Sequence, residues 1–299
     1  MSEKILVIVE SPAKCKKIQG ILGSKYIVKA SFGHIRNIDK KKGLSAIDIN
    51  NNYKPKYTII HRKRKYIKEL QKYKKKCKEV IIAADLDREG EAIGYHLVDI
   101  LKLDILTTKR IVFNEITKSA IQLAIKNPKV LDQNLINAQK ARQILDFMIG
   151  FDISPILWQH VRNHSSAGRC QSPALKLLCD KELQIKNFKE YGYFHIEGIF
   201  KNTNDIQFIS KSNSKIENKK EILKILNEFK TAQFTLKHIK HKLSVSKPSA
   251  PYITSTIQQD ANSKLNLTPK ITMSILQKLY ESGKITYMRT DSKILSKKA

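Results

Sequence analysis

The sequence predicts a multi-domain protein that begins with an α/β domain built on a mainly parallel sheet. Over the first 130 residues, short apolar segments alternate with segments of helical periodicity, as consecutive βα units do. Farther along, the pattern changes to long helices and then to an alternation of polar and apolar residues that is typical of strands. The 299 residues, of which 41% are hydrophobic, are enough for two or three domains with cores of their own.

Four strands are expected in the first part, at 4–10 (KILVIVE), 26–31 (YIVKAS), 79–85 (EVIIAAD) and 110–115 (RIVFNE). Helices are expected to begin at Ser11-Pro12, near Arg64, at Gly90 and at Thr117. The first of these starts is the best defined, because serine is a favoured N-cap and proline fits the first helical turn.

The rest of the chain divides by its hydrophobic pattern. Apolar residues spaced by three or four predict amphipathic helices over 133–150 and 172–185. Alternation in YFHIEGIF (193–200) predicts a strand, the polar segment 201–220 a loose connection, and SVSKPSAP (244–251) a linker before helical pattern resumes. We therefore expect four parts at 1–132, 133–190, 191–249 and 250–299, with the loop at about 36–56 able to pack on the second part.

Charge is the strongest feature of the composition. The chain has 56 Lys and Arg against 27 Asp and Glu, a net charge of +29, which indicates a polyanionic partner, most simply nucleic acid. Part of this excess can be compositional, because abundant Lys, Asn and Ile are what an AT-rich genome would produce. The longest basic stretch, at 54–78, is expected to be in large part a solvated helix face.

Other classes find little support in the sequence. No apolar run approaches the roughly 18 residues of a membrane span, and we expect no membrane association. The four cysteines show no C-x-x-C spacing, so neither a zinc site nor a disulfide framework is expected, and a reducing cytosol fits.

An acidic cluster stands out in this basic chain. The segment AADLDREGEAIGYHL (83–97) places Asp85, Asp87, Glu89 and Glu91 within seven positions, and Glu10 ends the first expected strand. Functional groups collect at the carboxyl ends of parallel strands, so these carboxylates should meet there. Mg²⁺ is the expected occupant, since it prefers oxygen ligands. The alternative is an acidic helix N-terminus stabilised by the helix dipole, with Arg88 as a partner.

A possible nucleophile lies near the end of the chain, in SGKITYMRTDS (282–292). The Tyr287 oxygen could attack phosphorus if a cation such as Arg289 stabilises the charge on the phosphoryl oxygens. A tyrosine with a purely structural role is the alternative. No P-loop motif occurs, so ATP-driven chemistry is not expected.

Eight segments, in the same order along the chain, resemble bacterial DNA topoisomerase I, a type IA enzyme: LVIVESPAK (6–14), ASFGHIRNI (30–38), DLDREGEAI (85–93), FNEITKSAI (113–121), NAQKARQILD (137–146), SAGRCQSPAL (166–175), APYITSTIQQDA (250–261) and YESGKITYMRTDS (280–292). The segments ESPAK and SAGR are more similar to topoisomerase I than to topoisomerase III. The resemblance implies a toprim α/β domain, a helical domain for single-stranded DNA, a partial β-rich arch and an incomplete tyrosine domain.

The resemblance also implies catalytic roles. Tyr287 would take the 5′ phosphate of a broken strand, and Arg289 would stabilise the phosphoryl transfer. Glu10 would hand a proton to the 3′ oxygen and recover it on religation. Lys14 would lie near the scissile phosphate, with a solvated place in the first helical turn as the alternative.

The implied metal ligands are the toprim acidic residues Asp85, Asp87 and Glu89 together with Glu10, and the implied cofactor is Mg²⁺.

Implied DNA contacts begin on the NAQKARQILD segment. Arg142 would contact the DNA backbone and Asp146 a base edge, whereas the alternative is an i,i+4 ion pair between them. Phe151 and Trp158 would stack on bases or else lie in the core. The remaining implied contacts are His34, Arg36, Gln143, Ser166, Ala167, Gly168, Arg169, Cys170, Gln171 and Asp291. Gln143 stands where many relatives have arginine, and NID (37–39) departs from the family pattern, so base preference is open.

The expected function is that of a monomeric type IA topoisomerase at the bacterial nucleoid in the cytoplasm. It would cut and rejoin single-stranded segments of negatively supercoiled DNA without ATP and so relax it. The chain ends twelve residues after Tyr287, where relatives continue, so we expect an incomplete tyrosine domain. The alternatives are a single-strand-binding remnant without activity, a topoisomerase III-like decatenase, and a toprim nuclease or primase that would not need Tyr287.

Overall fold

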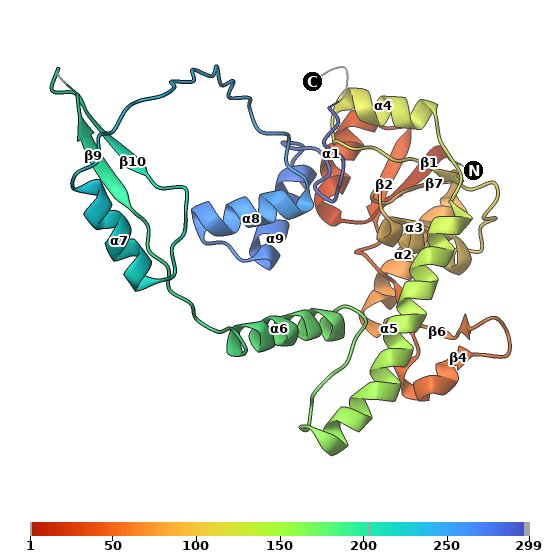
Figure 1. Ribbon diagram of the computed structural model, residues 1–299. Helices are drawn as coiled ribbons and strands as arrows, with labels where there is room; N and C mark the ends of the chain where they lie inside the picture. The colour runs from red at the N-terminus through yellow and green to blue at the C-terminus, as the bar shows by residue number, and fades with distance from the viewer. Residues whose placement is uncertain (1, 203, 296–299) are drawn as a thin grey trace. The chain divides into compact units, whose positions relative to one another are not determined.

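The computed structural model describes residues 2–202 and 204–295, and its contacts group them into two compact units (Figure 1). The first unit combines Met1–Gln171 with Ser249–Ala299, and the second is Ser172–Pro248. The end of the chain therefore folds with its beginning. The expected division into four parts stays a prediction.

The first unit is built on a four-stranded parallel sheet in the order β2-β1-β7-β8. The strands are β1 (Ser2–Val9), β2 (Tyr26–Ala30), β7 (Cys77–Ala83) and β8 (Lys109–Arg110). Val7 of β1 pairs with Val28 on one side and with Ile81 on the other. The predicted α/β class with a parallel sheet is confirmed.

The last predicted strand, 110–115, is too long, because β8 stops at Arg110. The Ile111 N–H still donates to the Ile82 carbonyl of β7 at 2.8 Å, and the backbone after it bonds to the segment that carries Tyr280 and Tyr287. The carbonyl of Phe113 accepts from the Tyr280 hydroxyl at 3.3 Å, and that of Asn114 accepts from the Tyr287 N–H at 2.7 Å. Because Tyr280 and Tyr287 are far from residues 110–115 in the sequence, the local sequence does not indicate where the strand ends.

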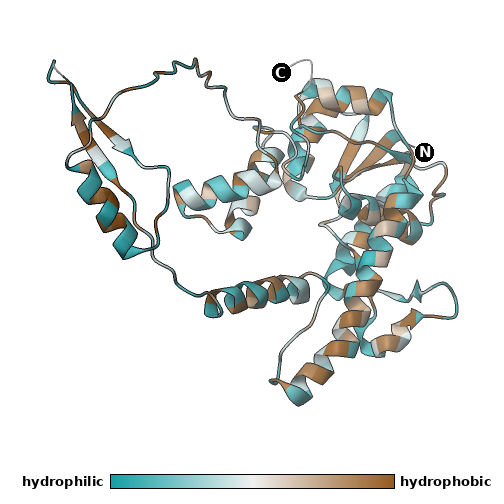
Figure 2. Ribbon diagram, in the orientation of Figure 1, coloured by the Kyte–Doolittle hydropathy of each residue, from teal (hydrophilic) through white to brown (hydrophobic). Residues whose placement is uncertain are grey.

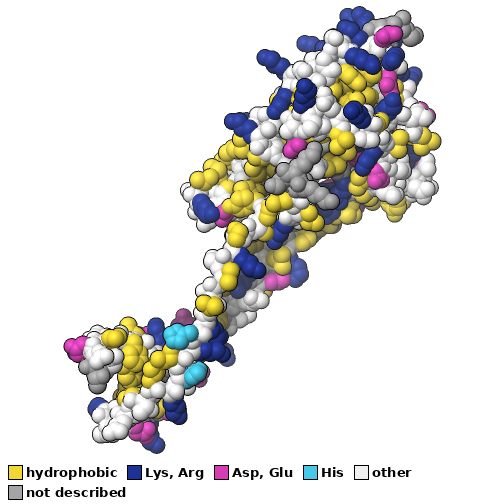
Figure 3. Space-filling model, turned by 90° about the horizontal axis from the view of Figure 1, so that it is seen from above, with side chains coloured by type: hydrophobic (Ala, Val, Ile, Leu, Met, Phe, Trp, Pro, Cys, Tyr) yellow, Lys and Arg dark blue, Asp and Glu magenta, His cyan; other side chains and the backbone are white. Residues whose placement is uncertain are grey.

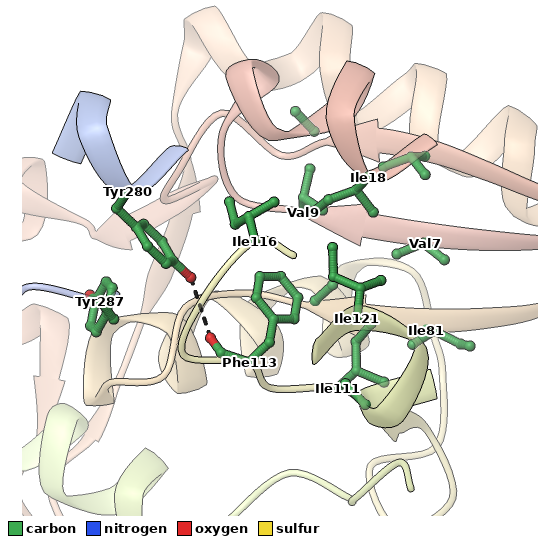
Figure 4. Packing of buried hydrophobic residues seen from close by; sticks show 14 of the residues in the cluster. Val7, Val9, Ile18, Ile81, Ile111, Phe113, Ile116, Ile121, Tyr280 and Tyr287 are labelled. Atoms are coloured by element: carbon green, nitrogen blue, oxygen red, sulfur yellow. Dashed lines mark hydrogen bonds between the residues drawn. The ribbon is translucent and has the colours of Figure 1, made fainter. Parts of the chain in front are cut away.

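Helices cover both faces of the sheet. On one face, α1 (Pro12–Leu22) and α4 (Lys118–Lys126) pack with Val7, Val9 and Ile81 (Figure 4). On the other, α2 (Arg64–Lys76) and α3 (Arg88–Ile100) pack with Leu6, Ile8 and Ile82. The alternation along β1 follows from the period of two in a strand, and because both faces are covered the whole strand is apolar.

The helix starts follow their caps. The Ser11 side chain accepts from the Ala13 N–H at 3.2 Å, and Thr117 caps α4. Helix α3 begins at Arg88, two residues before the predicted start, because Asp87 rather than a later residue is its N-cap.

The segment after β2 forms a small lobe. Strands β3 (Arg36–Ile38) and β6 (Tyr57–Ile59) pair antiparallel, as do β4 (Ile47–Asp48) and β5 (Lys54–Pro55). The lobe also contains the 3₁₀ helix η1 (Lys40–Ala46), and a second 3₁₀ helix, η2 (His61–Lys63), leads into α2. Its buried residues Ile38, Ala46 and Ile47 pack on Phe147 and Met148 of α5 (Gln133–His160). Helix α5 runs ten residues beyond the predicted end at Gly150, through Pro155.

The last part of the first unit holds α8 (Thr254–Leu265) and α9 (Pro269–Glu281). After α9 the chain turns at Gly283, whose φ of 70° and close approach to the Ile116 carbonyl exclude a side chain, since a Cβ would lie 2.7 Å from that oxygen. This turn directs Tyr287 and Met288 into the core beside Tyr280 (Figure 4).

The second unit contains most of α6 (Gln171–Lys186), an antiparallel hairpin of β9 (Glu197–Lys201) and β10 (Gln207–Lys211), and α7 (Lys219–Phe229). The expectation of a loose connection over 201–220 is wrong for β10, whose Phe208 ring stacks on Phe200 at 5.4 Å. Helix α7 was not predicted, although its apolar residues form a stripe among lysines (Figure 2). Neither β10 nor α7 was predicted, because the sequence around them is polar.

Candidate active site

A pocket of about 560 Å³ opens at the carboxyl ends of β1 and β7. Glu10 follows β1, Asp85 and Asp87 follow β7, and Tyr287 and Arg289 come from the segment after α9. The structure thus brings three of the predicted acidic residues together with the predicted nucleophile, which is 200 residues from Asp87, whereas Glu89 does not line this pocket.

Two local features hold the acidic turn in place. Gly90 lies against the backbone of Asp85, where a Cβ would come within 2.2 Å of the carbonyl oxygen, so only glycine fits. The Gly90 N–H also donates to Asp87 Oδ1 at 2.8 Å. The N-terminus of α3 therefore fixes the positions of both aspartates. Asp87 also caps this helix, which is the role that the helix-dipole alternative gave to the acidic residues.

Asp85 and Asp87 each have partners of their own. Asp85 pairs with Lys14, whose side chain is fully buried. Asp87 Oδ2 accepts from the Tyr287 hydroxyl at 2.6 Å and from Arg289 Nη1 at 2.9 Å. The solvated alternative for Lys14 is wrong, because its ammonium lies inside the protein.

Glu89 and His34 form the third pair, with 2.8 Å between His34 Nε2 and Glu89 Oε2. This hydrogen bond, followed by smaller contributions that include the charge of Arg142 on α5, outweighs partial burial and holds the pKa of Glu89 below its ordinary value. His34, predicted as a DNA contact, therefore lies at the acidic cluster.

Glu91 has a different role from its three neighbours. It is 4% exposed, and its carboxylate accepts from Arg110 Nε at 2.5 Å and from the Asp132 N–H at 2.7 Å. Arg110 also donates to the carbonyls of Ala84 and Asp85, both at 2.9 Å. Arg110 was not predicted as part of the site. The only feature of the sequence that could have indicated it is its charge at the start of an apolar segment.

Crowding of negative charge appears in the pKa of Glu10. Burial, followed by the charge of Asp85, raises the pKa to about 7, against the opposing effect of Lys14. Near neutral pH this carboxyl can therefore both donate and accept a proton.

Tyr287 remains protonated in this setting. Burial and then its hydrogen bond to Asp87 raise the pKa of the phenol above its ordinary value. Burial also raises the pKa of Asp87, but the hydrogen bonds from Tyr287 and Gly90 and the charge of Arg289 outweigh it and lower the pKa. The proton between the two thus belongs to Tyr287 before any substrate binds.

The donor chemistry suits Mg²⁺, although the carboxylates are directed at other partners. Glu10, Asp85 and Asp87 line one pocket and supply only oxygen donors. Burial is the largest cause of the raised pKa of Glu10, and the negative charge of Asp85 is the next, a repulsion that a divalent cation would relieve. Within residues 2–202 and 204–295, no three Asp, Glu, His or Cys side chains are arranged closely enough to hold a metal ion together.

The predicted DNA contacts on α5 are largely accessible. Phe151 is 37% exposed and Trp158 is 48% exposed, so the core alternative is wrong for both. Trp158 donates its indole N–H to the Ser165 carbonyl at 2.6 Å, and the Phe151 ring lies 4.5 Å from Phe147. The contacts hold each ring while leaving surface free for stacking.

Asp146 pairs with Arg169 through two bonds of 2.8 and 3.2 Å, not with Arg142 as the i,i+4 alternative required. Arg142 is exposed. The SAGRCQ segment is thereby tied to α5, which it also contacts through the Ala167 N–H and Ser154 Oγ at 3.3 Å. Arg169 can contact DNA only if its guanidinium releases Asp146 or binds Asp146 and the DNA at the same time.

The other predicted contacts differ in accessibility. Ser166, Cys170, Gln171 and Asp291 are exposed, Gly168 is half-buried and Ala167 is buried. Gln171 Nε2 donates to Ser166 Oγ at 3.1 Å, and the Tyr57 hydroxyl donates to Gln143 Oε1 at 3.4 Å.

The Arg36 side chain is largely taken up by contacts within the protein. Its guanidinium pairs with Asp99, donates to His96 Nδ1 at 2.5 Å and lies over the ring of Tyr57 at 4.7 Å. This packing makes Arg36 a structural link between β3 and α3.

Two family models and a solved structure match this chain. A family model for the Toprim domain matches residues 5–116, and one described as DNA topoisomerase matches 130–299. The structure of full-length topoisomerase I from Thermotoga maritima, in a monoclinic crystal form, is similar with a TM-score of 0.85 and 38% identity. That match covers 98% of this chain and 50% of the other, so this chain spans half the length of that topoisomerase. No helix among the described residues is long and apolar enough to cross a membrane.

Proposed function

The chain belongs to the family of bacterial type IA DNA topoisomerases, and we propose that it cuts and rejoins one DNA strand through Tyr287. The observation that carries the proposal is the Tyr287 hydroxyl 2.6 Å from Asp87, in a pocket shared with Glu10 and Arg289. A nucleophile, a carboxylate that accepts its hydrogen bond, a proton donor and a cation are thereby gathered at one point.

Cleavage is a transesterification. The Tyr287 oxygen bonds to phosphorus while the bond from phosphorus to the 3′ oxygen breaks, which leaves a 5′-phosphotyrosyl ester and a free 3′ hydroxyl. Asp87 is placed to take the phenol proton, and Glu10, with a pKa of about 7, to give one to the 3′ oxygen. Arg289 stabilises the charge on the phosphoryl oxygens. Reversal of the same steps reseals the strand without ATP.

Glu10, Asp85, Asp87 and Glu89 would hold a Mg²⁺ ion, whose chemistry when bound is to neutralise and polarise the phosphodiester. Lys14 and Arg289 now pair with Asp85 and Asp87, and His34 forms a hydrogen bond with Glu89. A DNA phosphate in the pocket would give Lys14 and Arg289 a second anion to bind, which would free oxygens of Asp85 and Asp87 for the ion.

We propose that single-stranded DNA reaches the pocket along α5, where Phe151 and Trp158 offer ring faces and Arg142 a cation. The substrate would be the single-stranded segments of negatively supercoiled DNA, and relaxation the outcome in the complete enzyme. Action on DNA supports a place at the bacterial nucleoid, and the chain is proposed to act as a monomer.

The test is covalent trapping. The 299-residue chain is incubated with Mg²⁺ and a single-stranded oligonucleotide labelled at its 3′ end, and the reaction is stopped with SDS. Labelled protein is expected from the parent chain and none from Tyr287→Phe, because the substitution removes only the attacking oxygen.

Binding of the same oligonucleotide is the control and should be equal for the two chains. An adduct that persists in Tyr287→Phe would sink the assignment of the nucleophile. Binding by both chains without any adduct would favour the single-strand-binding remnant.

A further inference from the structure

One face of α2 carries six exposed cations: Arg64, Lys65, Lys68, Lys72, Lys75 and Lys76. Their spacing of three or four residues places them together on about a third of the helix circumference. The helix has one acidic residue, Glu69, which pairs with Lys29 at 2.8 Å. Within the described part of the chain, none of the six cations forms an ion pair with a carboxylate.

This face is not explained by helix stability. Arg64, Lys68, Lys72 and Lys76 are spaced by four, and like charges at that spacing destabilise a helix. Cations in the last turn are favoured by the helix dipole, but Arg64 and Lys65 occupy the first turn, where the dipole disfavours them. An external anion would turn these unfavourable charges into a binding surface.

The face is connected to the candidate active site. Lys63, the residue before α2, lines the pocket that holds Glu10 and Tyr287, and its ammonium binds the Phe32 carbonyl. At the other end of the helix, lysines including Lys68, Lys72 and Lys102 line a second hollow of about 620 Å³. The basic face of α2 therefore extends for about 18 Å from the end of the helix beside the pocket to this second hollow, roughly half a turn of duplex DNA.

Excess charge alone would not single out this face, because Lys and Arg are spread over other surfaces as well (Figure 3). What separates it is the regular alignment, the absence of carboxylate partners and the link to the pocket. We propose that the basic face of α2 binds the phosphate backbone of duplex DNA that flanks the cleavage site.

Duplex DNA fits better than a single strand because the face offers no place to stack bases. Surfaces for single strands combine cations with accessible aromatic rings. The tyrosines of α2 are already occupied: Tyr66 stacks on Phe32 at 3.9 Å, and Lys29 covers Tyr73 at 4.5 Å. A surface that consists only of cations binds phosphates. A duplex exposes its phosphates while its bases are paired inside, so it needs no stacking surface.

The test measures binding of a short blunt-ended duplex as a function of salt, in a Tyr287→Phe background so that no adduct forms. The variant combines Lys68→Gln, Lys72→Gln and Lys75→Gln. Its control combines Lys118→Gln, Lys126→Gln and Lys129→Gln, which remove the same charge from exposed sites on and after α4, a helix on the opposite face of the sheet. Melting temperatures show whether each chain is folded.

The α2 variant should lose at least tenfold in duplex affinity at moderate salt, and its slope of log affinity against log salt should fall by about two to three. The control variant should keep most of the duplex affinity and most of the salt dependence. Equal losses in the two variants, or an unchanged slope in the α2 variant, would overturn the proposal. So would an equal loss for a single-stranded oligonucleotide, which would make the face a single-strand track.

A second measurement uses the unsubstituted chain, so that folding of a variant does not enter. Acetylation of lysines is followed by mass spectrometry with and without the duplex. Protection of Lys68, Lys72 and Lys75, with Lys118, Lys126 and Lys129 unprotected, is expected. Protection confined to the α4 lysines would contradict the proposal. The inference goes beyond the cleavage chemistry, and both measurements remain valid if no adduct is ever observed.

Discussion

The four carboxylates of residues 85–91 have two separate roles, although they are evenly spaced in the sequence. Asp85, Asp87 and Glu89 bind a lysine, a tyrosine with an arginine, and a histidine at the edge of the pocket. Glu91 is buried and accepts a hydrogen bond from Arg110, and this pair supports the turn that carries Asp85 and Asp87. Acidic residues are therefore proposed to serve chemistry at three positions, and the fourth forms a buried ion pair.

Glu91→Gln should lower the free energy of unfolding by about 3–5 kcal/mol, because it leaves the charge of Arg110 buried without a counter-ion. Urea denaturation of the two chains measures the difference. Glu79→Gln is the matched control, since it removes a more exposed ion pair, with Lys109, and should cost less than about 1 kcal/mol. Equal losses would show that the Glu91–Arg110 pair is not a structural support.

His96 makes stability depend on pH. Burial, followed by the charge of Arg36, lowers the pKa of this imidazole from 6.5 to about 2, so it is neutral when folded. Below pH 6.5 the unfolded chain takes up a proton that the folded chain does not, and stability falls as pH falls. Between pH 7 and pH 5 this group should remove about 2 kcal/mol of stability.

His96→Gln should therefore reduce the loss of stability between these two pH values by about that amount, as measured by urea denaturation at each pH. A loss equal to that of the parent chain would show that His96 is not the group responsible.

At the scale of elements, α5 and α2 present different surfaces. Helix α5 presents accessible rings at Phe151 and Trp158, whereas α2 presents cations and keeps its tyrosines covered. Stacking on rings requires unpaired bases, and contact with cations requires only phosphates. The two helices are thus suited to single-stranded and duplex parts of one substrate.

Trp158→Ala should weaken binding of a single-stranded oligonucleotide by roughly 5- to 150-fold, the range expected for the loss of one stacked base. Fluorescence anisotropy gives the affinity. Leu123→Ala removes an exposed apolar side chain from α4 and should change it little. If duplex affinity falls as much as single-strand affinity, Trp158 does not stack on a base.

At the scale of the whole chain, the beginning and the end form one compact unit, and this contact completes the site. Tyr280 and Tyr287 enter the same core as β1 and α1, and the backbone of Tyr287 bonds to Asn114. The proposed nucleophile is thereby held by the domain that carries the acidic residues.

The sequence by itself determined the parallel sheet, the helix caps and the acidic turn, because each depends on residues close together in the chain. Strand periodicity, Ser11 with Pro12, and the spacing of Asp85, Asp87 and Gly90 are all local signals. The family resemblance added Tyr287 and Arg289 as candidates at the far end of the chain, and their roles, like Mg²⁺ binding, stay predictions.

Only the tertiary structure decided which partner each charged group has. Glu91 with Arg110, Asp146 with Arg169 and Tyr287 with Asp87 are separated by 19, 23 and 200 residues, and none of these three pairs was foreseen from the sequence. A buried charge or hydroxyl must find a partner, but many residues of suitable type are available along the chain. Which one it meets depends on how the packed apolar faces place the backbone, and that placement leaves no pattern in the local sequence.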